Sequence, residues 1–84
     1  MSDLTNLPNI GKEMELKLKS IGIDTKERLI DIGSEEAFFK LKTKYPNVCL
    51  VHLYALEGAI QNMDFNCLSE KTKARLKTFS DTLK

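Results

Sequence analysis

The stretch Leu7-Pro8-Asn9-Ile10-Gly11-Lys12 decides the fold, together with Ser20-Ile21-Gly22-Ile23-Asp24-Thr25, which begins ten residues after Ile10. A residue before proline is pushed out of the α region, so any opening helical turn should end at Leu7. Each Ile-Gly pair stands where one helix should stop and the next should start. The first pair also places bare backbone N–H groups beside a lysine at a helix N-terminus, which is an arrangement that binds anions.

The length and composition fit one small domain. The chain has 84 residues, of which 42% are hydrophobic and 30% are charged. Ordering such a chain costs on the order of 100 kcal/mol in conformational entropy, so nearly all the apolar residues must be buried together. We therefore expect a single domain over residues 1–84.

The spacing of apolar residues predicts about five helices and no strand. The first helix covers Lys12 to Ser20, and a second, capped by Asp24 or Thr25, ends at Gly33. Ser34 should cap a third helix. The fourth and longest, roughly Val48 to Gln61 with Asn47 as its cap, is apolar on most of its circumference and belongs at the centre. Ser69 with Thr72 opens the last helix. The fold class is thus a compact all-α five-helix domain.

The periodicity also predicts which side chains form the core. The central members should be Leu18, Ile21, Leu29, Leu41, Leu53, Leu56 and Phe79. Cys49 and Cys67 have apolar neighbours and are interpreted as small, reduced core residues. The unit Leu-x-x-Ile-Gly recurs every eleven residues, ending at Gly11, Gly22 and Gly33. A small repeat and three helix ends of the same construction explain it equally well, and we interpret it first as packing geometry at helix ends.

The sequence favours a cytoplasmic location. The N-terminus lacks the basic start and apolar run of a secretory signal. The longest apolar stretch, Val48 to Ile60, is interrupted by His52, Glu57 and Gly58 and falls short of the ~20 residues that a bilayer span requires. Two cysteines make a disulfide framework unlikely, which fits a reducing compartment. We expect no membrane association.

The chain carries no pattern typical of an enzyme. There is no nucleophile-base-acid set, no paired carboxylates and no Walker-type phosphate loop, and one histidine with two distant cysteines lacks metal-ligand spacing. We therefore expect no catalytic, cofactor-binding or metal-binding residues. His52 is interpreted as a packed or half-exposed helix residue. Glu57 should receive hydrogen bonds from the N-terminus of another helix or from the hairpin, and Gly58 should let another helix approach closely.

Two surfaces could contact nucleic-acid phosphates. The first is the hairpin, where the amides of Ile10, Gly11 and Lys12 would bind a phosphate oxygen and Lys17 or Lys19 would reach the neighbouring backbone. The second is a basic face of the last helix, formed by Lys71, Lys73, Arg75 and Lys77, to which Lys40, Lys42 and Lys44 could add if they lie beside it. Glu13 and Glu15 oppose the first site, because acids in the first turn repel a phosphate.

Most of the positive charge lies in the second half of the sequence, away from the hairpin. Residues 1–39 hold five basic and eight acidic side chains, a net −3, whereas residues 40–84 hold eight basic and four acidic ones, a net +4, which together give the +1 of the whole chain. A net charge this close to neutral provides no strong global attraction to nucleic acid.

The sequence resembles a known family. Leu7 to Gly33 resembles the helix-hairpin-helix modules of DNA-handling proteins and the helical C-terminal domain of the bacterial RNA polymerase alpha subunit. Adding Leu53-Tyr54-Ala55-Leu56-Glu57-Gly58-Ala59 and Leu68-Ser69 makes nearly the whole chain similar to the C-terminal domain of the TfoX (Sxy) competence-regulator family. The resemblance implies an all-α fold, a bacterial cytoplasmic setting and a link to regulation of natural transformation genes. Full regulators of this type have a separate N-terminal domain, which is absent from this sequence. We therefore expect this chain to be a stand-alone copy of the C-terminal module.

Two functional hypotheses follow. The first is a regulatory nucleic-acid-binding accessory module that contacts the phosphate backbone without reading sequence, and its binding should weaken steeply with salt. The second is a protein-interaction module in a transcription or competence assembly, which should bind a regulatory protein in a salt-tolerant way. The partner, the choice between DNA and RNA and the oligomeric state are left open by the sequence.

Overall fold

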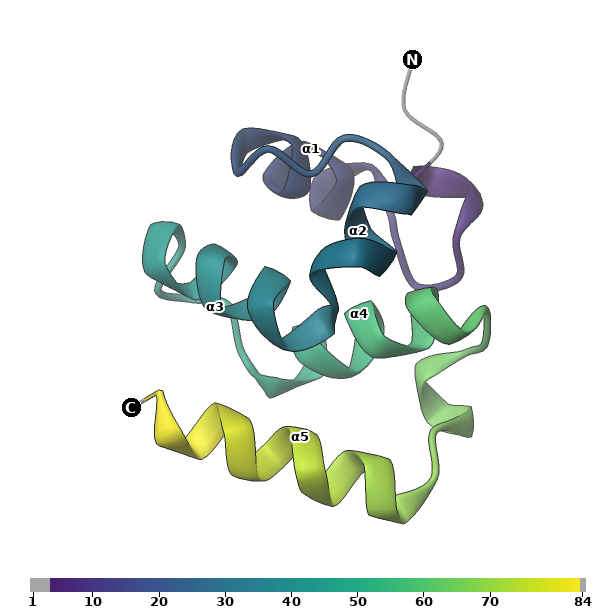
Figure 1. Cartoon of the computed structure of the whole chain (residues 1–84), viewed down its shortest axis with the longest axis vertical. Coiled ribbons are helices and arrows are strands. Elements are labelled where there is room, and N and C mark those ends of the chain that lie inside the picture. Colours follow the sequence, from purple (N-terminus) through teal and green to yellow (C-terminus); the bar gives the residue numbers. More distant parts are fainter. Residues whose placement is uncertain (1–3, 84) are drawn as a thin grey trace.

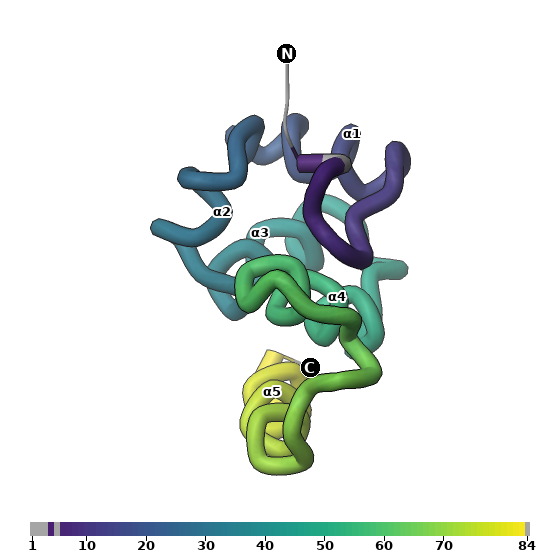
Figure 2. The backbone as a smooth tube through the Cα atoms, turned by 90° about the vertical axis from the view of Figure 1, so that its right-hand side faces the viewer, coloured from purple at the N-terminus to yellow at the C-terminus, as the bar shows by residue number. Residues whose placement is uncertain are grey.

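The structure, a computed structural model, describes residues 4–83 and confirms the all-α fold. Its five α-helices are α1 (Lys12–Ser20), α2 (Lys26–Ile32), α3 (Ser34–Lys44), α4 (Leu50–Gln61) and α5 (Glu70–Thr82). Two short 3-10 helices, η1 (Leu4–Asn6) and η2 (Phe65–Cys67), complete the elements, and no strand occurs over residues 4–83. Figures 1 and 2 show α1 and α2 at one end of the long axis and α5 at the other end.

Helix α4 lies at the centre, as its apolar circumference predicts. It contacts α2, α3, η2 and α5, and Figure 1 shows it between the upper helices and α5. Its Leu53 and Leu56 are completely buried. None of the helices over residues 4–83 is long and apolar enough to cross a membrane.

Three helix ends have the geometry that the sequence predicts. Gly22, at φ 90°, ends α1 in a Schellman motif, in which the Ile23 N–H donates to the Leu18 carbonyl at 2.9 Å. The Thr25 hydroxyl accepts a hydrogen bond from the N–H of Arg28 at 3.1 Å and caps α2. Ser69 caps α5 in the same way.

Two predicted caps are wrong. Helix α4 begins at Leu50 with Cys49 as its cap, whereas the prediction placed its start at Val48 with Asn47 as the cap. Val48 is buried in the core and precedes the helix. Ser34 is the first residue of α3, whose cap is Gly33, and the Ser34 hydroxyl turns towards Glu57.

Most of the predicted core is confirmed. Leu18, Leu29, Leu41, Leu53 and Leu56 are completely buried, whereas Ile21 and Phe79 are only partly buried against the core. Ile23, Phe38 and Leu76 occupy fully buried positions as well. The prediction that Cys49 and Cys67 are core residues is wrong, because both are exposed free thiols.

The three Leu-x-x-Ile-Gly units differ in construction, so their interpretation as equivalent helix ends is wrong. Gly22 and Gly33 have φ near 90°, which favours glycine, and both follow a helix. Gly11 precedes a helix and has ordinary extended backbone at φ −92°. In the first unit the positive φ belongs to Asn9, at 69°.

Asn9 fixes the N-terminal segment to α4. Its side-chain amide donates to the Met63 carbonyl at 3.0 Å and to the Ala55 carbonyl at 3.4 Å, and its side-chain oxygen accepts the Phe65 N–H at 3.2 Å. Gly58 makes room for this arrangement, because a Cβ there would lie 2.6 Å from the Asn9 nitrogen and 2.8 Å from the Met63 carbonyl oxygen. The close approach predicted at Gly58 exists. It is made by the Asn9 side chain and by the segment after α4, including Phe65 at the start of the 3-10 helix η2, whose Cα lies 3.2 Å from the Cβ position.

Candidate nucleic-acid interface

The first turn of α1 presents backbone N–H groups that no side chain caps. The cap residue, Gly11, is exposed, and a Cβ there would meet no atom within 4 Å. Neither packing nor backbone strain therefore requires glycine at this position. Lys12 is exposed and makes no ion pair within residues 4–83. The absence of a side chain at Gly11 leaves the helix N-terminus open, and anions are stabilised at such an end.

Ile10 has a different role from the two residues that follow it. Its side chain is in the core, at 5% exposure, and its N–H donates to the Leu7 carbonyl at 3.4 Å. Ile10 therefore anchors the turn, and its amide, which was predicted to bind phosphate together with those of Gly11 and Lys12, is bonded within the chain.

The acid closest to this helix end is partly neutralised. The Lys17 ammonium lies 3.3 Å from the Glu13 carboxylate, one helical turn away. The Glu13 side chain is 86% exposed, so this pair contributes little stability. It offsets the negative charge beside Gly11 only in part, because Glu15, the other acid of the first turn, makes no ion pair within residues 4–83.

A basic cluster that sequence reasoning missed lies at the other end of α1. The Lys44 ammonium, at the end of α3, donates to the carbonyl of Ser20 at 3.2 Å. Lys17 and Lys44 both approach the Tyr45 ring, at 5.5 and 5.9 Å from its centroid. The Tyr45 hydroxyl is hydrogen-bonded to that of Ser20 at 2.8 Å. Two cations, Lys17 of α1 and Lys44 of α3, thus meet at Tyr45 near the C-terminal part of α1.

The basic residues predicted on α5 form a separate surface. Lys71, Arg75 and Lys77 are exposed and Lys73 is half-buried, but α5 lies at the opposite end of the molecule from α1 (Figure 1). The predicted addition of Lys44 to this face is wrong, because Lys44 contacts α1. The Lys77 ammonium lies 3.5 Å from the Asp81 carboxylate, so one of the positive charges of this α5 surface is already paired.

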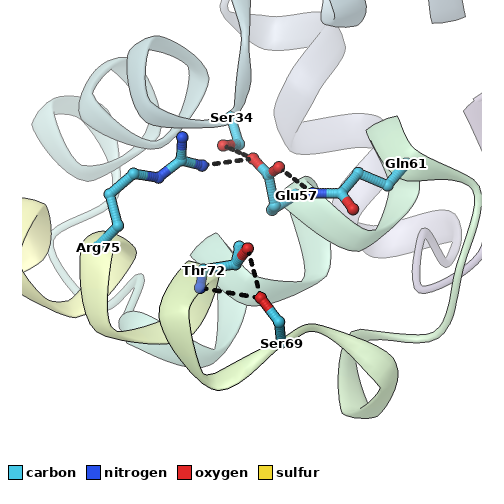
Figure 3. Close-up of polar contacts among 6 residues, drawn as sticks. All are labelled: Ser34, Glu57, Gln61, Ser69, Thr72 and Arg75. Atoms are coloured by element: carbon cyan, nitrogen blue, oxygen red, sulfur yellow. Dashed lines mark hydrogen bonds and ion pairs between the residues drawn. The ribbon is translucent and has the colours of Figure 1, made fainter.

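Arg75 belongs to a polar cluster around Glu57 (Figure 3). The Ser34 hydroxyl donates to the Glu57 carboxylate at 2.5 Å, the Arg75 guanidinium lies 3.5 Å from the same oxygen, and the Gln61 amide donates to the other oxygen. The Glu57 side chain is only 12% exposed, and a buried carboxylate is costly unless it is satisfied in this way. The prediction that Glu57 accepts from the N-terminus of another helix is confirmed for Ser34 of α3. This cluster ties α3, α4 and α5 together.

His52 takes part in the start of α4. Its Nδ1 accepts the N–H of Cys49 at 3.1 Å, and the side chain is half-exposed, as predicted. Its ring also borders a hollow between the α1 start and α4, together with Gly11 and Lys17. No group of histidine, cysteine and acidic side chains over residues 4–83 is arranged to hold a metal ion.

Comparison with known proteins shows which family the chain belongs to. The model of the TfoX C-terminal domain family matches residues 1–80. The chain belongs to the TfoX C-terminal domain family. A curated relative, the DNA transformation protein TfoX of Haemophilus influenzae, is 33% identical over 76 residues, which are 90% of this chain and 35% of that protein. The chain therefore spans about a third of the length of its curated relative.

Solved structures share the same fold as this TfoX C-terminal domain. An uncharacterized protein from Listeria monocytogenes, in a triclinic crystal form, has a TM-score of 0.93 at 45% identity, covering 95% of this chain and 91% of its own. A protein of unknown function from the same organism, in a tetragonal form, has a TM-score of 0.92 at 44% identity, covering 95% of this chain and 99% of its own. The printed name of the Haemophilus influenzae relative links that protein to DNA transformation.

Proposed function

We propose that this TfoX C-terminal domain is a non-enzymatic cytoplasmic accessory module that binds the phosphate backbone of nucleic acid along α1. One observation carries the proposal. Neither a positive φ nor close packing requires glycine at position 11, and Gly11 leaves the first turn of α1 without a side-chain cap beside the exposed Lys12. Backbone N–H groups at a helix N-terminus, with a lysine beside them, are a common way to hold a phosphate oxygen.

The rest of α1 supports a second and third phosphate contact. Lys17 and Lys44 flank Tyr45 at the C-terminal part of the helix, and α1 is nine residues or about 13 Å long. A strand that follows α1 would meet Lys12 near its start and Lys17 with Lys44 towards its end. Such contacts position a protein on nucleic acid without reading its sequence. The printed name of the Haemophilus influenzae relative, a DNA transformation protein, is consistent with DNA as the nucleic acid.

The experiment is a titration of a short fluorescent DNA duplex, followed by anisotropy at two salt concentrations. If Lys12, Lys17 and Lys44 neutralise three phosphates, affinity should fall roughly 40-fold between about 50 and about 200 mM salt. This follows because the logarithm of the association constant falls with the logarithm of the salt concentration with a slope of about −0.9 per phosphate contact. Lys12→Ala should weaken binding at low salt and reduce the slope by about one.

Lys71→Ala is the matched control, because it removes an exposed lysine from α5 at the far end of the molecule. It should leave affinity unchanged. If Lys71→Ala weakened binding while Lys12→Ala did not, the contact surface would be α5 and the assignment to α1 would be wrong. If wild-type protein did not bind the duplex even at low salt, the proposal as a whole would fail.

A second candidate function is a protein-interaction module, and the groove between α3 and α5 favours it. This groove is lined by Ile32, Phe79 and Leu83 together with Phe39, whose side chain is 49% exposed. Exposed apolar surface in a groove is typical of sites that receive an amphipathic helix of a partner. Association through this surface should persist at a salt concentration that abolishes binding to the duplex.

A further inference from the structure

The groove between α3 and α5 and a second hollow beside α3 share Phe39 and Leu83 as lining residues. The groove is bordered by Glu35, Phe39 and Arg75, and the second hollow by Phe39, Lys42 and Pro46. Phe39 therefore stands between the two on the exposed face of α3. Its 49% exposure leaves about half of a large aromatic side chain in water, which costs free energy that a partner surface would recover.

Two charged residues of α3 flank Phe39 on this face, beside Glu36 and Arg75, which also line the groove. Glu35, Phe39 and Lys42 recur at i, i+4 and i+7, so they share one face of α3 with an acid one turn before the phenylalanine and a base one turn after it. Glu35 makes no ion pair within residues 4–83. Lys42 donates one hydrogen bond, to the Val48 carbonyl at 3.1 Å, and has two further N–H groups available.

This order of charges is complementary to itself. When two copies of α3 pack antiparallel with the two Phe39 side chains at the twofold axis, Glu35 of each copy lies beside Lys42 of the other. A parallel arrangement would instead place like charges together. Self-complementary patches of this kind are the property that a twofold homodimer requires.

We propose that the α3 face is a homodimer interface, in which the occupant of the groove is the α3 face of a second copy of this chain. The inference uses the groove of the second candidate function but requires no other protein and no nucleic acid. Helix α3 has 11 residues and is about 16 Å long, and a standard interface buries roughly 800 Å² per partner. A contact centred on one helix of this length is at the small end of that range, so the dimer should be weak.

Sedimentation of the purified chain tests the proposal without any ligand. The mass should rise from 9.6 kDa towards twice that value as the concentration increases from about 10 µM to about 1 mM, the range in which small interfaces associate. Phe39→Ala should raise the dissociation constant at least about tenfold, because central aromatic residues dominate small interfaces. Val51→Ala, which removes an equally exposed side chain from α4, should have no effect.

Charge reversal provides the decisive arm of this experiment. Glu35→Lys and Lys42→Glu should each abolish association alone, and an equimolar mixture of the two variants should restore it, because the mixture pairs a basic face with an acidic one. Thermal unfolding of each variant establishes that it is folded. A wild-type chain that stays monomeric throughout, or a mixture that does not associate, would overturn the proposal. Since no DNA is present, either failure is distinct from failure of phosphate binding.

Discussion

Replacing Gly58 by alanine tests the contact that fixes the hairpin to the central helix. The added Cβ would lie 2.8 Å from the Met63 carbonyl oxygen and 3.2 Å from the Phe65 Cα, both of which are backbone atoms, and 2.6 Å from the side-chain nitrogen of Asn9. The Asn9 side chain can rotate away, but it would then lose its bonds to Met63 and Phe65. The backbone atoms can move only if the segment after α4 shifts.

The expected loss of stability follows from three contributions. Overpacking of this kind costs typically 1–3 kcal/mol, and two lost hydrogen bonds of a partly buried group cost about 1 kcal/mol each. Alanine in a helix interior is favoured over glycine by roughly 0.5–1 kcal/mol, which acts in the opposite direction. The net prediction is a loss of about 3 kcal/mol, which for a domain of this size lowers the melting temperature by roughly 12–24 °C.

Urea denaturation followed by circular dichroism measures this change. Gly11→Ala is the matched control, because no atom lies within 4 Å of its Cβ position, and a change at this cap should cost no more than about 1 kcal/mol. Combining Gly58→Ala with Asn9→Gly should cost less than the sum of the two, since both act on the same contact. A Gly58→Ala protein as stable as wild type would refute the reasoning, because helix propensity would then outweigh the contact.

Four further substitutions, one of them used only in a double-mutant cycle, probe the rest of the fold. Gly33→Ala should lower the free energy of unfolding in urea by at least about 2 kcal/mol. Space for a Cβ is available there, but φ 88° and ψ 159° form a backbone region that is nearly restricted to glycine. An unchanged urea midpoint would show that the α2 to α3 junction can relax. Glu57→Gln should destabilise the domain by roughly 1–3 kcal/mol, since it removes the charge that Ser34 and Arg75 contact. In a double-mutant cycle with Arg75→Ala, the coupling should stay below about 1 kcal/mol, because Arg75 is 59% exposed, and a larger value would mean that the pair is shielded from water. Asn9→Ala should destabilise more than Asn9→Gly, because both remove the side-chain hydrogen bonds but only glycine adopts φ 69° without strain; the reverse order in a thermal melt would contradict this assignment.

The local signals in the sequence predicted the helices well. Positive φ at Gly22 and capping by Thr25 and Ser69 depend on neighbouring residues only, so they can be predicted from short motifs. The same reasoning placed Ser34 as a cap, and this failed because the competing partner, Glu57, is 23 residues away and belongs to another helix. The exposure of Cys49 and Cys67 was missed for a similar reason, since apolar neighbours in sequence do not determine which way a helix end faces.

In the candidate site, too, features that depend on neighbouring residues were predicted, whereas contacts between residues distant in sequence were not. Gly11-Lys12 at the start of a helix was recognised from the motif, but the role of Asn9 was not, because its three hydrogen bonds join it to residues 46 to 56 positions later. The cluster around Tyr45 was missed as well. Lys44 reaches Ser20 only because α3 packs beside α1, and no spacing in the sequence indicates which helices become neighbours.

The most direct test of the central claim is a map of backbone amide shifts during titration with a short DNA duplex at low salt. We expect the shifts to be confined to residues 9–13 and to the surroundings of Lys17 and Lys44, and to disappear at moderate salt. Shifts located on α5 and around Phe39 of α3, with residues 9–13 unmoved, would contradict the claim that the open start of α1 binds phosphate.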